Sequence, residues 1–542
     1  AEGASLVSVS DQPVAGQGRY RQASASLLGL SVFFVVAPVC AENWRITPSI
    51  ALTETWTDNV FLTARDPKSD LVTGITPGIA IDGKGSRVSL RLNYTFTEQL
   101  YARNYQNAEL LTGQTSASNN HQNALNAVGK LEAIENWMFI DATGTISQQY
   151  FSPFGAVSPS TANVNRNQTE TSNYAISPYI KGTLLSSTEY LVRYRAAITN
   201  TSGSGVQSNQ GDLTTSEWTG RLNGTTRWGA LGWALDASSL RNNYTVGRDY
   251  DDSKYQASLS YRFEPQFRVS AFAGQESNNY VSLQNETHAI YGGTVTWTPE
   301  PRTEISASDS KRFFGNGYDV NIRHRMARAL VTYTASRNVV FQPSGVGNTG
   351  QGINYDAFYA IIAANNPGAS PDAIRSQVLK VLQNSGVAAD STVVNGYLTN
   401  RPNLQQMQQL SVALLGVRNT VTLNANETKQ QPLGVVNGVT NDFSLANQTT
   451  QRGFGIIWGH QLTGLSSLSL SLNQMRSISQ SVGQLDTKTQ GAYLLFTTRL
   501  SPKAQATIGA RHVISDGGAI SSAGLGSSYT ESALTGSLTY SF

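Results

Sequence analysis

Histidines are the side chains of this sequence best suited to acid–base or metal chemistry, and they are widely scattered. None has the spacing of a metal site, and neither a Gly-x-Ser-x-Gly nucleophile elbow nor a phosphate-binding loop is present. We therefore expect polar wall or interface residues, with no catalytic residue, no metal and no cofactor. A triad assembled across distant strands stays open as an alternative. The five histidines are His121, His288, His324, His460 and His512.

A second candidate for chemistry is the acidic cluster Asp249, Asp251 and Asp252. Carboxylate oxygens bind Ca²⁺, but the spacing lacks the glycine and the distal glutamate of an EF-hand loop. A solvated loop is the favoured interpretation, and a Ca²⁺ site is the alternative.

Arginines at polar positions of alternating segments predict a charged inner wall. In one interpretation they pair with acidic neighbours and stabilise the wall. In the other, a basic lumen favours anionic solutes, because fixed charges select ions at close quarters. The arginines are Arg87, Arg91, Arg193, Arg195, Arg221, Arg262, Arg268, Arg328, Arg499 and Arg511, and the acidic neighbours are Glu189, Glu217, Asp236, Glu264 and Glu304.

The elements that carry these residues are expected to be strands, because polar and apolar residues alternate. In the segment 86–98, Val88, Leu90 and Leu92 fall on one face, and Arg91 and Asn93 fall on the other. Many such runs are long enough to cross a bilayer obliquely, which needs about 9–11 residues. Charged residues make up 14% of the chain and apolar ones 39%. This mixture suits strands with one apolar and one uncharged polar face, and it disfavours helical membrane spans.

Short turns and long polar loops are expected to alternate between the strands, as they do in outer-membrane barrels. Counting with that rule predicts one large antiparallel transmembrane β-barrel of about 22 strands, with a range of roughly 20–24. The barrel is expected to occupy residues 42–542. An even strand count places both termini in the periplasm.

One segment, residues 341–406, breaks the strand pattern and is expected to be a partly helical extracellular insertion. Ser370 and Pro371 form a helix start, and Ile374, Val378 and Leu382 follow as an apolar stripe. A second, weaker helix is expected at 355–363. Tight turns predicted near Arg337 and Arg418 place the insertion on the extracellular side. We expect it to narrow or gate the extracellular mouth.

Residues 1–41 are expected to be a signal peptide and the residues that precede it. Arg19 and Arg21 come before an apolar run, 27–36, which is followed by small residues and a cleavage site before Glu42. The single cysteine, Cys40, would be removed with this segment. Lipid modification of Cys40 is the alternative.

The last strand ends in a pattern that resembles the recognition signal of the barrel-assembly machinery. Alternating residues lead to a terminal aromatic side chain. They are Leu534, Gly536, Leu538, Tyr540 and Phe542.

The N-terminal third of the expected barrel contains sequence segments that resemble those of a known family. The segments are 44–50 (WRITPSI), 54–62 (ETWTDNVFL) and 75–79 (ITPGI), with further matching sequence at 140–149 and in the terminal strand. They resemble the PEP-CTERM-system-associated outer-membrane proteins, which are grouped with β-barrel porins. The resemblance implies an association with exopolysaccharide and exosortase loci, and it identifies no catalytic residue.

The expected function is an outer-membrane channel for export of an exopolysaccharide or another extracellular polymer, and not an enzyme. A porin-like diffusion channel and a structural or adhesive surface barrel are the alternatives. Expected partners are outer-membrane lipids and lipopolysaccharide, the barrel-assembly machinery and periplasmic polysaccharide-export proteins. The net charge of +3 is too small to indicate nucleic-acid binding.

Overall fold

The structure is a computed structural model of the 542-residue chain. It describes residues 44–103, 121–150, 152–165, 167–184, 187–202, 212–226, 229–341, 353–366, 369, 371–385, 401–434, 448–480, 485–517 and 528–542. The expected signal peptide, 1–41, lies outside the described residues.

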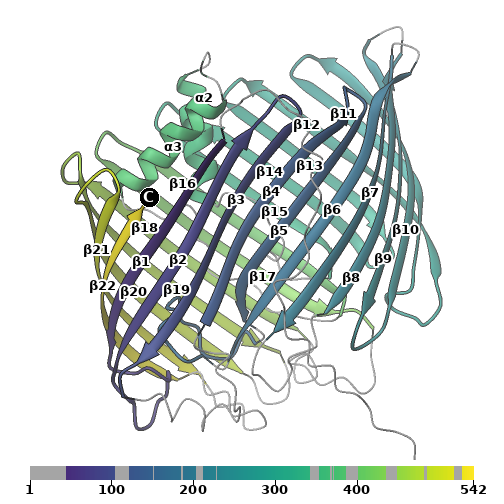
Figure 1. The fold of residues 1–542 in the computed structure, drawn as a ribbon. Coiled ribbons are helices and arrows are strands. Elements are labelled where there is room, and N and C mark those ends of the chain that lie inside the picture. The colour runs from purple at the N-terminus through teal and green to yellow at the C-terminus, as the bar shows by residue number, and fades with distance from the viewer. Residues whose placement is uncertain are drawn as a thin grey trace, which may run out of the picture. The chain divides into compact units, whose positions relative to one another are not determined.

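Twenty-two strands make up the wall of the barrel, and the described residues between β15 and β16 include two helices (Figure 1). The helices are α2 (Ile353–Asn365) and α3 (Pro371–Ser385). No helix of the described residues is long and apolar enough to cross a membrane. The strands are β1 (Trp44–Thr57), β2 (Asp70–Lys84), β3 (Val88–Tyr101), β4 (His121–Ile134), β5 (Met138–Tyr150), β6 (Gln168–Leu184), β7 (Thr188–Ser202), β8 (Leu213–Thr225), β9 (Leu231–Tyr244), β10 (Tyr250–Glu264), β11 (Phe267–Asn278), β12 (Glu286–Glu300), β13 (Thr303–Arg312), β14 (Gly315–Arg325), β15 (Ala329–Val340), β16 (Asn403–Leu415), β17 (Asn419–Pro432), β18 (Thr449–Gln461), β19 (Ser466–Ser479), β20 (Asp486–Arg499), β21 (Ala504–Gly517) and β22 (Tyr529–Ser541).

The barrel is closed and antiparallel, as the sequence predicts. Each strand pairs with the next along the chain, and β1 pairs with β22 from Ser49–Ser541 to Thr57–Ala533. Closure leaves no free sheet edge, so the strands satisfy one another's backbone hydrogen bonds. The predicted count of about 22 strands is confirmed.

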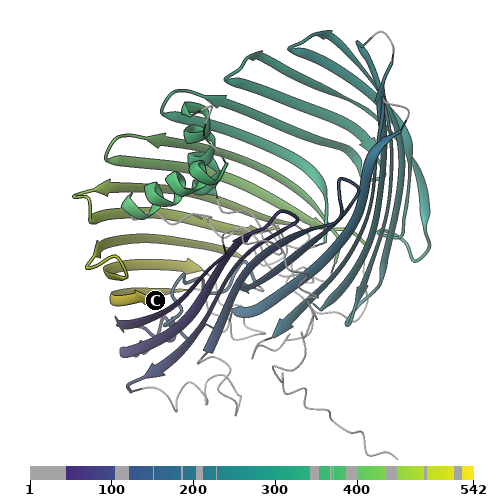
Figure 2. The same cartoon turned by 45° about the horizontal axis from the view of Figure 1, so that its top comes forward.

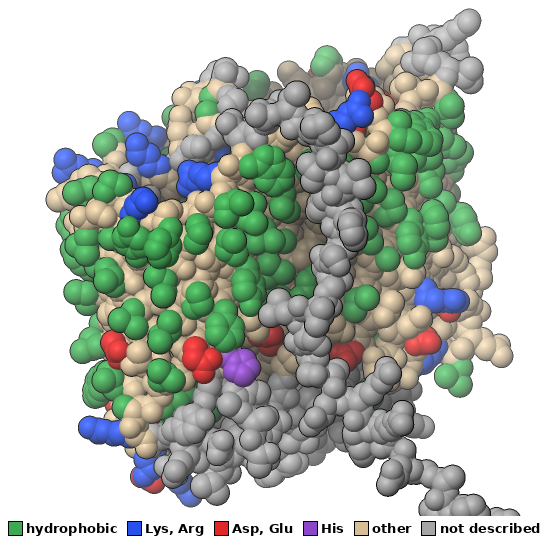
Figure 3. All heavy atoms as spheres, viewed as in Figure 1, with side chains coloured by type: hydrophobic (Ala, Val, Ile, Leu, Met, Phe, Trp, Pro, Cys, Tyr) green, Lys and Arg blue, Asp and Glu red, His purple; other side chains and the backbone are tan. Residues whose placement is uncertain are grey.

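The alternation along β1 defines the outer and inner faces of the wall. Ile46, Ile50, Leu52 and Trp56 share one face and are 44–59% exposed, whereas Thr57 on the other face is fully buried. Cross-strand partners share a face, so the strand registers carry this assignment around the barrel. Figure 3 shows apolar side chains across the middle of one side, with most charged side chains nearer its two ends. A closed barrel with such an outer belt presents apolar groups to lipid, and the chain is an integral outer-membrane β-barrel.

The two mouths of the barrel differ in their connections. Short turns such as 85–87, 265–266, 301–302 and 416–418 lie at the mouth that also holds Trp44 and Phe542, which we call the short-turn mouth. The other end, the long-loop mouth, carries connections such as 58–69 and 151–167. Outer-membrane barrels have short turns on the periplasmic side and longer loops outside. The short-turn mouth therefore faces the periplasm.

One predicted tight turn is wrong. Residues 336–338 lie inside β15, and the turn at the short-turn mouth is 326–328. At the long-loop mouth β13 and β14 are joined by a tight hairpin at 313–314, which breaks the strict alternation of short and long connections. Gly315 ends this hairpin with a φ of +96°, a conformation that favours glycine.

The terminal strand gives the first testable prediction. Tyr540 and Phe542 form an edge-to-face aromatic pair on the outer face of β22, where they are 40% and 63% exposed. Tyr540 stands opposite Ile50 in the closing pair of strands. Deleting Phe542, or changing Tyr540→Asp, should lower the amount of folded barrel in the outer membrane, because the last strand must present its apolar face during insertion. Heat-modifiable mobility on gels measures the folded amount.

The matched control is Thr539→Asp, which puts the same charge on the neighbouring inner-face position of β22. Levels equal to wild type for both outer-face variants would contradict the expected role of the terminal aromatic residues.

Candidate functional site

The helical insertion lies at the short-turn mouth. Its connections leave β15 and rejoin β16 at the long-loop mouth, because Val340 stands opposite Asn403 at that end of the strand pair. The helices nevertheless lie at the other end, near Phe542, which Figures 1 and 2 both show. The side chain of Asn365, at the end of α2, donates a hydrogen bond of 2.8 Å to the carbonyl of Ala327 in the short turn 326–328. The segment therefore reaches the periplasmic end of the barrel.

An apolar cluster holds the helices against one side of the wall. Ile374, Val378 and Leu382 of α3 are buried, with exposures of 5%, 0% and 5%. They pack with residues of α2 and with wall residues from β15 and β16, which lie next to the short turns. The buried members are Leu330, Tyr355, Ala357, Phe358, Ala360, Ile361, Ile362, Ile374, Val378, Leu382 and Ala413.

The helices also touch a second part of the wall, at β2 and β3, and β2 lies five strands further around the barrel from β19. Arg375 of α3 forms an ion pair of 3.6 Å with Asp82, an inner-face residue of β2. Tyr355 at the start of α2 has a raised pKa because its side chain is buried. The nearby positive charge of Arg91 on β3 offsets part of this rise. Since α2 contacts β15 and β16 while α3 contacts β18 and β19, the pair of helices extends from that wall toward β2 and β3.

This placement corrects one expectation. The sequence predicts that Ile374, Val378 and Leu382 narrow the extracellular mouth, whereas the structure brings them to the periplasmic one. The apolar stripe of α3 must pack against other apolar side chains. Leu330 and Ala413 are such residues, and they lie on the inner wall near the short turns, so the stripe is buried there.

The predicted inner-wall arginines occupy three kinds of position. Arg195, Arg221 and Arg511 form ion pairs with acidic residues of adjacent strands, and Arg193 of β7 pairs with Asp141 of β5, two strands away. Arg87, paired with Glu135, and Arg328 lie in short turns and not in strands. Inner-face positions also hold Arg91, Arg262, Arg268 and Arg499, with Arg262 directly opposite Arg268.

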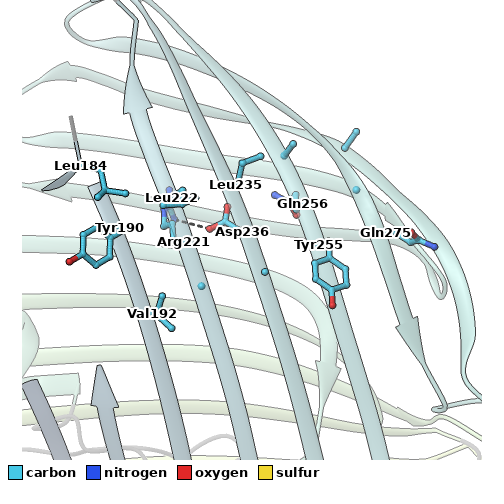
Figure 4. Close-up of a pocket in the computed structure, with 15 residues that line it drawn as sticks. Leu184, Tyr190, Val192, Arg221, Leu222, Leu235, Asp236, Tyr255, Gln256 and Gln275 are labelled. Atoms are coloured by element: carbon cyan, nitrogen blue, oxygen red, sulfur yellow. Dashed lines mark ion pairs between the residues drawn. The ribbon is translucent and has the colours of Figure 1, made fainter. Parts of the chain in front are cut away.

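The ion pairs offset much of the charge on the inner wall. Nitrogen–oxygen distances are 3.4 Å for Arg193–Asp141, 3.9 Å for Arg195–Glu217 and 3.7 Å for Arg221–Asp236. Figure 4 shows the last pair between β8 and β9. These side chains are partly exposed, so each pair contributes about 0–1 kcal/mol to stability. The sequence allows two interpretations of the inner-wall arginines, ion pairing and a basic lumen. For these three arginines the structure shows ion pairing.

Figure 4 also displays a depression on the outer face of β7–β11, with a volume of about 840 Å³. Val192, Leu222, Leu235 and Tyr255 line it, and small residues such as Ala257 form its floor. These side chains belong to the lipid-facing belt.

The inner wall from β15 to β19 is uncharged. Every inner-face residue of these strands is neutral, and hydroxyl and amide side chains predominate. Several are buried with a polar atom that has no hydrogen-bond partner within the described part of the chain. These are Gln405, Thr420, Thr422, Thr428, Gln430 and Gln451. The lumen thus has a charged side and a neutral hydrogen-bonding side.

The loop between β5 and β6 is packed at the long-loop mouth. Asn163 in this loop donates a hydrogen bond of 2.7 Å to Glu531 of β22, which also accepts one of 2.8 Å from Thr57 of β1. Arg511 of β21 forms an ion pair of 2.7 Å with the same carboxylate, which is fully buried. The loop is therefore attached where the first and last strands meet.

An aromatic cluster covers another part of the long-loop mouth. Tyr244, Tyr250, Tyr280, Phe313 and Phe341 pack together near the ends of β9–β15. The Tyr280 hydroxyl donates a hydrogen bond of 2.7 Å to Asp252, and burial raises its pKa. Sequence reasoning missed this cluster and the β5–β6 loop. Aromatic residues at strand ends are visible in the sequence, but no local sequence feature indicates that these particular residues contact one another.

The histidines do not come together. They lie on β4, β12, β14, β18 and β21, and within the described residues no three histidine, cysteine or acidic side chains form a group that could hold a metal ion. Asp251 forms an ion pair of 2.7 Å with Arg241, and Asp252 accepts the bond from Tyr280. Both carboxylates have protein partners.

No family model and no curated protein matches this chain. The resemblance of its N-terminal third to the PEP-CTERM-associated family therefore stays a prediction. Solved structures that resemble it include the siderophore receptor PirA from Acinetobacter baumannii, with 11% identity, a TM-score of 0.44 and coverage of 92% of this chain and 80% of that one. The FrpB iron transporter from Neisseria meningitidis has 7% identity, a TM-score of 0.47 and coverage of 93% and 82%. OccK1 (OpdK) from Pseudomonas aeruginosa has 9% identity, a TM-score of 0.33 and coverage of 92% and 99%. Likenesses at these values carry no inference about substrate or mechanism.

Proposed function

We propose that this chain is an outer-membrane transport barrel whose helical insertion restricts passage at the periplasmic mouth. The observation that carries the proposal is the position of α2 and α3. They are packed on β15, β16, β18 and β19 and also reach Asp82 of β2, five strands further around the barrel from β19, through Arg375. A purely structural barrel does not need two helices at the mouth of its lumen.

The proposed direction is export of a hydroxyl-rich polymer, such as an exopolysaccharide. The neutral wall of β15–β19 supports this substrate class, because hydroxyl and amide side chains exchange hydrogen bonds with sugar hydroxyls without holding an ion. The family resemblance supports it independently. A polymer arriving from the periplasm would meet the helices first, so a periplasmic polysaccharide-export protein is the partner suited to moving them.

A porin-like diffusion channel is the second candidate. The observation in its favour is the charged side of the lumen, where Arg262 and Arg268 stand opposite each other on the inner face. Two adjacent cations would attract small anions. Ion pairing of Arg193, Arg195 and Arg221 limits this preference, so we expect weak anion selectivity.

Current blockade in planar bilayers tests the substrate class. Neutral oligosaccharides added on the periplasmic side should interrupt the current of the protein lacking residues 342–400 more strongly than anionic ones of equal length. If only the anionic oligomers interrupt the current, the neutral-polymer proposal fails and the porin-like function is favoured.

The contact of α3 with β2 gives a further prediction. We expect the helices to leave the mouth transiently, which gives the channel a low- and a higher-conductance state. Asp82→Asn removes the charge that pairs with Arg375, and it should increase the fraction of time spent in the higher-conductance state by about two- to fivefold, as expected for an ion pair worth up to about 1 kcal/mol. Single-channel recording measures this fraction.

The matched control is Glu135→Gln, which removes an exposed ion pair with Arg87 at the same mouth. An equal change in both variants would contradict a specific role for Asp82.

A further inference from the structure

A row of charged residues crosses five neighbouring strands on the outer face of the barrel. Strand registers place Glu427 opposite Arg452, Arg452 opposite Arg476, Arg476 opposite Lys488, and Lys488 opposite Asp516. We call these five residues of β17–β21 the outer charged row.

The row points away from the lumen. Phe454 occupies the next outer position of β18 below Arg452 and is 48% exposed, and Leu472 and Leu494 lie further along the outer faces of β19 and β20. The inner positions beside the row, such as Ser477 and Thr487, are buried. A solute in the lumen therefore cannot reach the row, whereas a lipid outside the barrel can.

The position of the outer charged row along the membrane normal also matters. Arg452 lies near the start of β18 and Arg476 near the end of β19, both at the long-loop mouth. The apolar belt begins directly below them. Because the long-loop mouth faces outward from the cell, the row stands at the headgroup level of the outer leaflet.

Three of the five residues are consecutive cations. Like charges directly opposite each other on neighbouring strands are unfavourable, and here Arg452, Arg476 and Lys488 form two such pairs. A bound anion would remove this repulsion.

Acidic residues compensate for part of the charge. Glu427 accepts a hydrogen bond of 2.6 Å from Arg452 Nε and pairs with Lys429 at 3.1 Å, and Asp486 accepts one of 2.9 Å from Arg476 Nε. Lys488 forms no ion pair with any described residue, and the terminal guanidinium nitrogens of Arg452 have no hydrogen bond there. Donors thus remain on Arg452 and Lys488, which flank Arg476, after the acids are used.

We propose that Arg452, Arg476 and Lys488 bind a phosphate group of lipopolysaccharide in the outer leaflet. Guanidinium groups bind phosphate oxygens through paired hydrogen bonds, and lysine adds a point charge. The lipid acyl chains would then lie along the apolar outer positions that begin at Phe454. The site is independent of what passes through the lumen, so it does not rest on the proposed transport function.

Binding of lipid A to the purified full-length barrel, freed of bound lipids in detergent, tests the site. Bisphosphorylated lipid A carrying a fluorescent acyl chain is the probe. The Arg452→Gln/Arg476→Gln variant should bind it about tenfold or more weakly than wild type, because it loses charge-assisted hydrogen bonds to phosphate. Lys488→Gln, which breaks no ion pair among the described residues, should weaken binding in the same direction and serves if the double variant folds poorly.

The matched control is Arg241→Gln, which removes an isolated outer-face arginine of β9 that pairs with Asp251. It should bind the probe as wild type does, and dephosphorylated lipid A should bind wild type as weakly as the double variant binds the probe. The proposal is overturned if the double variant and Lys488→Gln keep wild-type affinity. It is also overturned if phosphatidylglycerol competes as well as lipid A, which would indicate a general attraction for anionic lipids.

Discussion

Replacing residues 342–400 with a short Gly-Ser bridge should raise the single-channel conductance of this barrel by about twofold or more, since the helices occupy part of the periplasmic mouth. The bridge is geometrically simple because Val340 and Asn403 face each other across adjacent strands. The strands on either side keep their partners, so the closed wall should persist. Planar-bilayer recording measures the conductance, and heat-modifiable mobility checks that the barrel is folded.

A triple substitution tests the same point without changing the length of the chain. Ile374→Ser, Val378→Ser and Leu382→Ser together remove the buried stripe that holds α3, and they should raise conductance in the same direction. Leu379→Ser is the matched control, because Leu379 lies on the same helix but is 49% exposed. Unchanged conductance in both the excision and the triple variant would show that the helices do not restrict passage.

Arg511→Met should destabilise the folded barrel by about 3–5 kcal/mol, because it leaves the carboxylate of Glu531 buried without its cation. Glu531 is fully buried, and the Arg511 side chain is 10% exposed. The loss should appear as a lower midpoint in urea unfolding from lipid vesicles.

Two further variants separate this effect from general damage. Arg511→Met combined with Glu531→Gln should recover part of the stability, because no charge is then left buried. Arg221→Gln removes a partly exposed inner-wall pair and should cost about 1 kcal/mol or less. If Arg511→Met and Arg221→Gln lower the stability of the barrel equally, burial of the Glu531 carboxylate does not make its ion pair more important than an exposed one.

Local patterns in the sequence predict the wall well, because strand alternation has a period of two and depends on near neighbours. They also predict both helices: the expected range 355–363 lies within α2, and α3 begins at Pro371 as expected. The failure at 336–338 has a local cause. Ser336, Arg337 and Asn338 resemble a turn in composition, whereas the turn actually made at the short-turn mouth, 326–328, is Met-Ala-Arg. The hairpin at the other mouth, 313–314, consists of two phenylalanines.

The arrangement inside the lumen could not be predicted in the same way. The apolar stripe of α3 shows that a partner must exist, but Leu330 and Ala413 are ordinary strand residues in the sequence. The contact of Asn163 with Glu531 joins residues 368 positions apart. Neither residue carries a local sign of the other. The orientation of the insertion follows from such long-range contacts, so the sequence placed it at the wrong mouth.

A cross-linking measurement between α3 and β2 tests whether the insertion restricts the periplasmic mouth. Arg375→Cys and Asp82→Cys, in a chain with Cys40→Ser, place one thiol on α3 and one on the inner face of β2. A short bifunctional thiol reagent should join them and hold the channel in its low-conductance state, and cleaving the linker should restore the openings seen without it. Efficient labelling of both thiols without cross-linking, or a conductance that does not respond to a formed cross-link, would show that the insertion does not restrict this mouth.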